Sequence, residues 1–212
     1  HERRVAAAIR RASPQIAVSL SADVMATVGE YERASTTVAN AYIQPIVRGY
    51  LARLRDGLGE LGIAGEPLIM TSDGGTVACD TAVAHPVRLV ESGPAGGAVA
   101  AAYCGVRAGF DDVIAFDMGG TTAKVCLIDD GRAERATEFE VARVYRFSRG
   151  SGLPLRVPVT KMIEIGAGGG SIARVDETGL LKVGPHSAGS EPGPACYARG
   201  GTVPTVTDAD LV

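Results

Sequence analysis

The sequence predicts an α/β protein, in which short apolar strands alternate with helices and glycine-rich turns. Apolar runs of strand length at residues 67–70 and 113–116 each lead into a turn that holds an aspartate and two glycines. Between residues 31 and 61, apolar side chains recur at every third or fourth position, which is the spacing of one helix face. The 28 glycines among 212 residues exceed average usage and gather in a few loops. Because ligands of open α/β sheets bind at the carboxyl ends of strands, we expect function in these loops.

The composition is that of a globular protein, with 46% hydrophobic and 21% charged residues. A net charge of −3 without a basic stripe argues against nucleic acid as a partner. No apolar run reaches membrane-spanning length and no signal peptide is visible, so we expect no membrane association. The four cysteines form no C-x-x-C pair, which argues against a zinc site and a disulfide framework. Thiols of this kind are typical of a reducing compartment, and we predict a cytoplasmic protein.

Short patterns predict the remaining elements of the first half of the chain. Residues 1–12 suit a helix, and residues 16–20 and 86–90 suit short strands. An alanine- and glycine-rich helix over residues 94–108 would pack closely on a sheet because its side chains are small. Pro45 either kinks one long helix or begins a second one.

The strongest candidate site is the stretch 113–128, which predicts a strand, a turn and a second strand. Asp117 lies where the first strand meets the turn, and Mg²⁺ is usually bound by one or two carboxylates plus phosphate oxygens. The N–H groups of such a turn can form an anion-binding nest. The turn residues suited to contact phosphate are Gly119, Gly120, Thr121 and Thr122. An ordinary hairpin with a Gly-Gly turn fits the same spacing.

Two further loops carry similar residues. Asp73 follows the strand at 67–70 in a turn with two glycines, which fits either a ligand site at a strand end or a plain Asp-Gly turn. The stretch 163–172 has four glycines in five positions, as expected of backbone that approaches something closely. Its candidate residues are Gly166, Gly168, Gly169, Gly170 and Ser171.

The second half also predicts two strand pairings and a capped helix. Residues 137–144 would add a third strand to the hairpin at 113–128 and so complete a three-stranded meander. Residues 172–175 and 180–183 form a second hairpin in this interpretation, and residues 205–210 begin a helix.

Several familiar chemistries are excluded by the motifs. The chain has no Gly-x-x-x-x-Gly-Lys-Ser/Thr loop and no Gly-x-Ser-x-Gly elbow. The glycine run at 166–170 lacks the long helix and the later acid of a dinucleotide-binding site. His85 and His186 have no partner spacing for zinc, and Cys196 lacks the basic neighbour of an activated thiol. Phosphate chemistry carried by strand-turn-strand hairpins remains.

The order of elements resembles the middle of the actin-like ATPase (ribonuclease H-like) fold. A strand, the sequence Glu91-Ser92-Gly93-Pro94, a small-residue helix and the hairpin at 116–121 follow one another as in that fold. The resemblance implies parts of two subdomains with mixed sheets. Residues 1–109, with the linking helix 94–108, would end the first subdomain, and residues 110–212 would begin the second.

A set of motifs in fixed order is similar to the hydantoinase A and 5-oxoprolinase family, which includes the ATP-using subunit of acetone carboxylase. The motifs lie at residues 70–75, 91–97, 116–121, 165–173, 183–189 and 192–197. The resemblance covers nearly the whole chain from about Ser19. It implies use of ATP and Mg²⁺ to activate a carbonyl of a cyclic amide, of the hydantoin or 5-oxoproline type, through a phosphorylated intermediate. It also implies a partner subunit of the hydantoinase B type.

The resemblance assigns roles to the candidate residues. Asp117 would hold Mg²⁺ through water and act in catalysis, while residues 119–122 would cradle the phosphates. Residues 166–171 would form a wall for nucleotide or substrate, and Asp73 would orient substrate or water. Many relatives have an aspartate where this chain has Lys124, so a second metal-binding acid is not expected there.

The resemblance also implies another Asp-Gly-Gly-Thr hairpin near the N-terminus of family members. We expect that hairpin to be missing here, because the Asp-Gly-Gly-Thr at residues 73–76 belongs to the turn of Asp73 described above. We therefore interpret the chain as a central part of a longer enzyme, and expect it alone to bind ATP weakly and turn over nothing. Two other functions fit the residues: a non-catalytic actin-like protein that binds ATP for assembly or sensing, and the ATP-using subunit of a ketone carboxylase.

Overall fold

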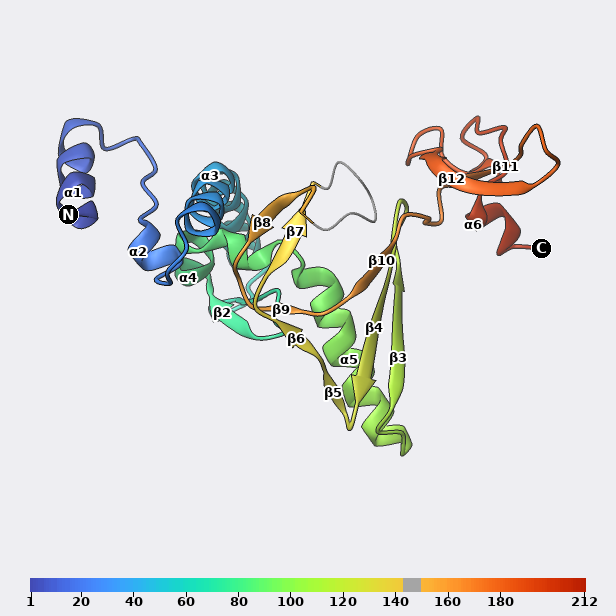
Figure 1. Ribbon diagram of the computed structural model, residues 1–212, viewed down its shortest axis with the longest axis horizontal. Helices are drawn as coiled ribbons and strands as arrows, with labels where there is room; N and C mark the ends of the chain where they lie inside the picture. Colours follow the sequence, from blue (N-terminus) through green and yellow to red (C-terminus); the bar gives the residue numbers. More distant parts are fainter. Residues whose placement is uncertain (143–149) are drawn as a thin grey trace. The chain divides into compact units, whose positions relative to one another are not determined.

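The computed structural model describes residues 1–142 and 150–212, which form a mixed α/β structure (Figure 1). The described residues divide into two compact units. Unit 1 consists of His1–Val99 and Arg135–Thr160, and unit 2 of Ala100–Glu134 and Lys161–Val212. The subdomain boundary predicted between residues 109 and 110 is a different division of the chain and stays a prediction.

Unit 1 is built mainly on helices. Its helical elements are α1 (Glu2–Ala12), α2 (Ser21–Val24), α3 (Glu30–Glu60), α4 (Cys79–Ala84), the 3₁₀ helix η1 (Pro86–Leu89) and the first part of α5 (Ser92–Ala108). Pro45 lies inside α3, so the predicted long helix is one element. None of the helices in the described residues is both long and apolar enough to cross a membrane.

Two predicted strands of unit 1 are wrong. Residues 16–20 form neither helix nor strand, and residues 86–89 form η1. Pro86 begins η1, because its fixed φ suits the first position of a helical turn. Ser72 holds this turn through bonds from its N–H and Oγ to the carbonyl of Arg88, at 2.7 and 2.6 Å. A short apolar run around Val87 cannot by itself distinguish a buried turn from a buried strand.

Buried polar side chains of α3 hold the loops that precede α2 and η1. Asn40 is fully buried, and its Nδ2 donates to Ser19 Oγ at 3.0 Å and to the carbonyl of Ala84 at 3.1 Å. Its Oδ1 accepts a bond from the N–H of Val87 at 3.2 Å. A buried amide with all these partners is a structural residue.

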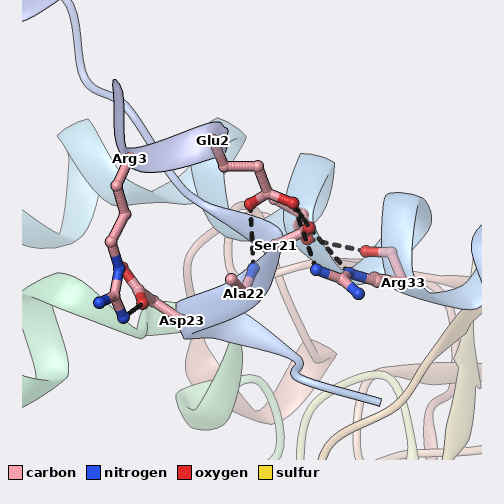
Figure 2. Close-up of polar contacts among 7 residues, drawn as sticks. Glu2, Arg3, Ser21, Ala22, Asp23 and Arg33 are labelled. Atoms are coloured by element: carbon pink, nitrogen blue, oxygen red, sulfur yellow. Dashed lines mark hydrogen bonds and ion pairs between the residues drawn. The ribbon is translucent and has the colours of Figure 1, made fainter. Parts of the chain in front are cut away.

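Side-chain contacts attach α1 to the following helices, as Figure 2 shows. Glu2 accepts bonds from Ser21 Oγ at 2.5 Å and from the N–H of Ala22 at 3.1 Å, and pairs with Arg33 at 3.2 Å. Arg3 pairs with Asp23 at 3.0 Å. The bond from Ser21, with smaller contributions from Ala22 and Arg33, lowers the pKa of Glu2.

Three short strand pairs complete unit 1. They are β1 (Leu68–Met70) with β2 (Thr76–Ala78), β6 (Arg135–Ala136) with β9 (Val159–Thr160), and β7 (Phe139–Val141) with β8 (Leu153–Leu155), all antiparallel. The core of the unit joins Val87 to side chains of α2 and of β8, β9 and the turn between them. The predicted strand at residues 67–70 is confirmed as β1.

The main sheet of unit 2 contains the predicted hairpin. β3 (Val113–Met118) and β4 (Ala123–Asp129) pair antiparallel from Val113 opposite Ile128 to Met118 opposite Ala123. β5 (Arg132–Ala133) and β10 (Ile163–Ile165) both pair with β4, which gives the order β10-β4-β3. Figure 1 shows β3 and β4 as the two long strands of this sheet.

The predicted three-stranded meander is wrong. Of residues 137–144, the last two lie outside the described residues, and Phe139–Val141 form β7 in unit 1. Phe139 and Val141 pack against the buried core of that unit, which explains why they leave the hairpin. The third strand beside β4 is β10, where Ile163 lies opposite Val125.

The end of the chain forms a second hairpin and a short helix in unit 2. β11 (Ser171–Val175) and β12 (Leu181–Ser187) confirm the predicted hairpin. The 3₁₀ helix η2 (Ala195–Tyr197) precedes α6 (Val206–Ala209), whose first turn carries the predicted cap at Thr205.

Candidate phosphate-binding site

The β3–β4 turn places Asp117 and residues 119–122 together in unit 2. The N–H of Gly119 donates to the carbonyl of Thr122 at 2.9 Å and closes the turn. Asp117 is exposed one residue before the end of β3, directly opposite Lys124. The turn therefore presents a carboxylate, two glycines and two hydroxyls within six residues.

The glycine-rich loop after β10 packs against this turn. The N–H of Gly169 donates to the carbonyl of Gly119 at 2.9 Å, and that of Gly170 to the carbonyl of Gly120 at 2.8 Å. A Cβ at Gly168 would lie 2.5 Å from the nitrogen of Thr121 and 2.6 Å from the carbonyl oxygen of Gly119. The close approach predicted for these glycines is thus an approach to the backbone of the β3–β4 turn, which they support through hydrogen bonds.

Ser171 supports the loop from inside the protein. Its side chain is 1% exposed, and its Oγ accepts a bond from the N–H of Gly168 at 2.9 Å. Its own N–H donates to the carbonyl of Gly168 at 2.9 Å. This geometry gives Ser171 a positioning role, and its predicted contact with a ligand stays a prediction.

Three N–H groups of the turn have no recorded hydrogen bond in the part of the chain that the structure describes. They belong to Gly120, Thr121 and Thr122. Neighbouring N–H groups in a turn, with hydroxyls beside them, suit an anion such as phosphate. The carbonyls of Gly119 and Gly120, by contrast, already accept bonds from the glycine-rich loop. The turn therefore offers donors and few free acceptors to a ligand.

Helix α6 and the loop after β12 both donate hydrogen bonds to the glycine-rich loop. The N–H of Thr207, in the first turn of α6, donates to the carbonyl of Gly169 at 2.8 Å. The N–H of Ala188 donates to the carbonyl of Gly170 at 2.8 Å. Sequence reasoning missed both contacts, because backbone bonds between distant segments leave no signal in residue type.

The carboxylate of Asp208 accepts several hydrogen bonds at the start of α6. Its carboxylate accepts bonds from the N–H groups of Cys196 at 2.7 Å, Thr205 at 2.8 Å and Ala195 at 3.3 Å, and from Thr205 Oγ1 at 2.8 Å. These bonds, that of the Cys196 N–H foremost, hold the pKa of Asp208 well below its usual range. The thiol of Cys196 also donates to this carboxylate, which raises the pKa of the thiol and disfavours the nucleophilic thiolate. Sequence analysis predicted the cap and missed the attachment to η2.

We expect Asp208→Asn to lower the thermal stability of the protein at neutral pH, measured by circular dichroism. The pKa of Asp208 is lower in the folded protein than in the unfolded chain. The ionised carboxylate therefore stabilises the fold fully at pH values above the unfolded-state pKa. This stabilisation is lost as the pH falls through the folded-state pKa. The melting temperatures of the wild type and the variant should therefore converge in strong acid. Asp210→Asn, on the same short segment, is the control and should melt like the wild type at both pH values. Equal melting at neutral pH for Asp208→Asn would contradict the role assigned to this carboxylate.

Asp73 lies in unit 1, whereas the β3–β4 turn belongs to unit 2. Its Oδ1 accepts bonds from Thr71 Oγ1 at 2.5 Å and from the N–H of Gly75 at 3.2 Å. Burial acts to raise the pKa of Asp73, but the bonds from Thr71 and Gly75, with the charge of Arg135, lower it overall. These contacts fit a self-contained Asp-Gly turn, and a role with substrate stays a prediction.

Asp117, the acidic residue beside the turn, fits a Mg²⁺ ion that arrives with a nucleotide. Among the described residues, no three His, Cys, Asp or Glu side chains group together as a metal cage. Mg²⁺ commonly keeps several waters and takes only one or two carboxylates plus phosphate oxygens. Asp117, exposed beside the open N–H groups, suits that arrangement.

The fold is mixed α/β, and the β3–β4 turn is its candidate site for phosphate. The sequence profile described as hydantoinase/oxoprolinase matches residues 33–212. The chain belongs to this family.

Curated relatives match the chain over nearly all of its length. It is 42% identical to an uncharacterized protein of Methanocaldococcus jannaschii and 39% identical to caprolactamase subunit alpha of Pseudomonas jessenii, each over 100% of this chain. The 5-oxoprolinase of Saccharomyces cerevisiae is 36% identical over 92% of it. The chain spans only 32%, 29% and 14% of these three relatives.

Solved structures agree with this assignment. A nucleotide-free acetone carboxylase, described as acting in ATP-dependent acetone carboxylation, matches 98% of the chain with a TM-score of 0.73 and 30% identity. The ATP-dependent caprolactamase of Pseudomonas jessenii matches 100% of the chain with a TM-score of 0.71 and 38% identity. The chain covers 28% and 29% of those two chains.

Proposed function

We propose that this chain is part of an ATP-dependent enzyme that activates the carbonyl of a cyclic amide, and that unit 2 binds the phosphates of ATP. The observation that carries the proposal is the β3–β4 turn, where the N–H groups of residues 120–122 face no recorded partner in the described chain. Family membership supplies the class of reaction. Two related proteins, the caprolactamase and the acetone carboxylase, are described as ATP-dependent.

We further propose that the chain belongs to an actin-like ATPase fold. The succession of α5 and the β3–β4 hairpin supports this, since in that fold a helix links two subdomains and a hairpin holds phosphate. Residues 1–109 and 110–212 would then belong to different subdomains of the whole enzyme.

The chain's own residues would act by positioning and charge. When bound, ATP would supply the phosphoryl group for the carbonyl oxygen, with ADP as the leaving group, and Mg²⁺ would offset the phosphate charge. The N–H groups and hydroxyls of Thr121 and Thr122 would orient the phosphates, and Asp117 would hold the hydrated ion. The loop 166–171 would fix the turn and form one wall of the site. Asp73 would orient substrate or water.

The substrate and partner are further parts of this proposal. The names caprolactamase and 5-oxoprolinase both denote action on a cyclic amide, which favours a lactam or hydantoin ring as substrate. The caprolactamase relative is named a subunit alpha, which favours a partner subunit of the hydantoinase B type here too. All four cysteines lie unpaired, in keeping with the cytoplasm as the proposed compartment.

A ketone carboxylase is the second candidate, because acetone carboxylase shares the fold of this chain at a TM-score of 0.73. The test is phosphate release from ATP by the whole enzyme, isolated with its partner subunit. We expect 5-oxoproline, hydantoin or a lactam to stimulate release above the rate with ATP alone. Stimulation by a ketone with bicarbonate instead would assign the carboxylase function. ATP bound but never consumed with any of them would favour the non-catalytic nucleotide-binding protein and contradict both enzymes.

A further inference from the structure

Helix α6 is joined to the β3–β4 turn by two backbone hydrogen bonds in series. The N–H of Thr207 donates to the carbonyl of Gly169 at 2.8 Å, and the N–H of Gly169 donates to the carbonyl of Gly119 at 2.9 Å. Gly119 directly precedes residues 120–122, whose N–H groups have no recorded partner in the part of the chain that is described. All of these residues belong to unit 2. The position of α6 therefore affects the N–H groups that are proposed to bind phosphate.

Contacts on two sides fix the start of α6. The N–H of Ala173, on β11, donates to the carbonyl of Pro204 at 2.9 Å, and the next residue, Thr205, is 1% exposed. On the other side, the carboxylate of Asp208 accepts a bond from the N–H of Cys196 at 2.7 Å. The N–H of Thr207 can bond outside the helix, because first-turn N–H groups have no partner within a helix. Thr207 thus donates to the loop from a segment that β11 and η2 both hold.

The glycine-rich loop needs such a support because glycine has the greatest conformational freedom of all residues. Residues 166–170 contain four glycines, so few side chains restrict this backbone. Its carbonyls at Gly169 and Gly170 accept bonds from the N–H groups of Thr207 and Ala188. Without the Thr207 bond the loop would sample more conformations, and a ligand would have to order the loop and the turn as it binds. Ordering at the moment of binding lowers affinity, whereas a preorganised site avoids that cost.

We propose that Thr207 is a positioning residue for the phosphates of ATP, an inference that rests on the proposed binding of ATP. Its main-chain N–H holds the glycine-rich loop, and the loop holds the β3–β4 turn with the N–H groups of residues 120–122 in place. This coupling is reciprocal: MgATP must stabilise the Thr207 bond by the same factor by which that bond strengthens MgATP binding. The segment 192–208, which has no other part in the proposed function, then contributes to the nucleotide site.

The first test compares MgATP binding by the 212-residue chain and by three variants, using calorimetry. Thr207→Pro removes the N–H, and we expect the dissociation constant to rise about fivefold, the size of one hydrogen bond. Thr207→Ala keeps the N–H and should bind like the wild type. Val206→Pro is the matched control, because it places proline at the first position of α6, where the N–H has no recorded bond in the described chain. It should also bind like the wild type.

Amide exchange of the wild-type chain tests the same coupling without any substitution, so it does not depend on whether Thr207→Pro folds. MgATP at saturation should slow exchange of the Thr207 N–H about fivefold, the same factor as the change in affinity. The N–H of Gly131, which donates to the carbonyl of Asp111 at 2.8 Å, is the control at the other end of the β3–β4 hairpin. Its exchange rate, measured by NMR in the same samples, should be the same with and without MgATP.

The outcomes separate this inference from the proposed function. Weaker binding in Thr207→Pro alone among the three variants, with slower exchange at Thr207 on MgATP binding, supports the positioning role. If the wild type binds MgATP, three results overturn that role and leave the proposed function standing: unchanged binding in Thr207→Pro, equal weakening in both proline variants, or unchanged exchange at Thr207. If thermal unfolding shows that Thr207→Pro is not folded, the exchange measurement decides. A wild-type chain that does not bind MgATP overturns the proposed function and this inference with it.

Discussion

Gly168→Ala should weaken nucleotide binding by this chain at least about tenfold. The new Cβ would lie 2.5 Å from the nitrogen of Thr121 and 2.6 Å from both the carbonyl oxygen of Gly119 and the carbonyl carbon of Gly120. All three are backbone atoms of the β3–β4 turn, so no side chain can rotate away. The turn itself must move.

The expected size of the effect follows from the cost of overpacking. Extra atoms in a packed site cost about 1–3 kcal/mol, and contacts with three backbone atoms place this change at the upper end. We expect MgATP affinity to fall at least about tenfold, which corresponds to 1.4 kcal/mol. Calorimetric titration of the 212-residue chain with MgATP measures the loss.

Gly97→Ala is the matched control for this prediction. Gly97 lies in α5, and a Cβ there would meet nothing within 4 Å. Alanine is the better helix former, so this variant should be as stable as the wild type or slightly more so, with unchanged binding. Normal MgATP affinity in Gly168→Ala would show that the turn is not the phosphate site, or that it does not depend on the loop behind it.

The strand-turn-strand hairpin and the long helix were predictable because their signals are local. The apolar run that ends at Asp117 and the three-to-four spacing through Leu51 are read directly from neighbouring positions. The third strand of the sheet was not predictable in this way. Whether β7 or β10 pairs with β4 depends on where Phe139 and Val141 find apolar partners, and those partners lie in unit 1.

In the candidate site, too, local features were predictable from the sequence and contacts between distant segments were not. The glycines of residues 166–170 signalled a close approach, and the structure identifies what they approach: the carbonyls of Gly119 and Gly120. The buried Oγ of Ser171 accepts a bond from the N–H of Gly168, a contact that residue type did not signal, and the predicted contact of Ser171 with a ligand stays a prediction. The anchoring of this loop by Thr207 uses only main-chain atoms, which any residue except proline at that position would supply.

Asp117→Asn should lower the turnover of the whole enzyme more than tenfold, since positioned catalytic groups typically contribute about 10²–10⁴-fold. Asparagine has the same shape but no charge, so it should leave the β3–β4 pairing intact while losing most of its attraction for hydrated Mg²⁺. The melting temperature should therefore stay at the wild-type value, unlike that of a variant in which the turn is displaced. Steady-state phosphate release at saturating MgATP measures the change.

Asp129→Asn makes the comparison specific to the site. Asp129 is an exposed aspartate at the far end of β4, so this variant removes the same charge from the same hairpin away from the turn. We expect it to turn over like the wild type. Normal turnover of Asp117→Asn as well would show that Asp117 has no part in the chemistry. The N–H groups of residues 120–122 would then have to bind phosphate without a metal-binding carboxylate on β3.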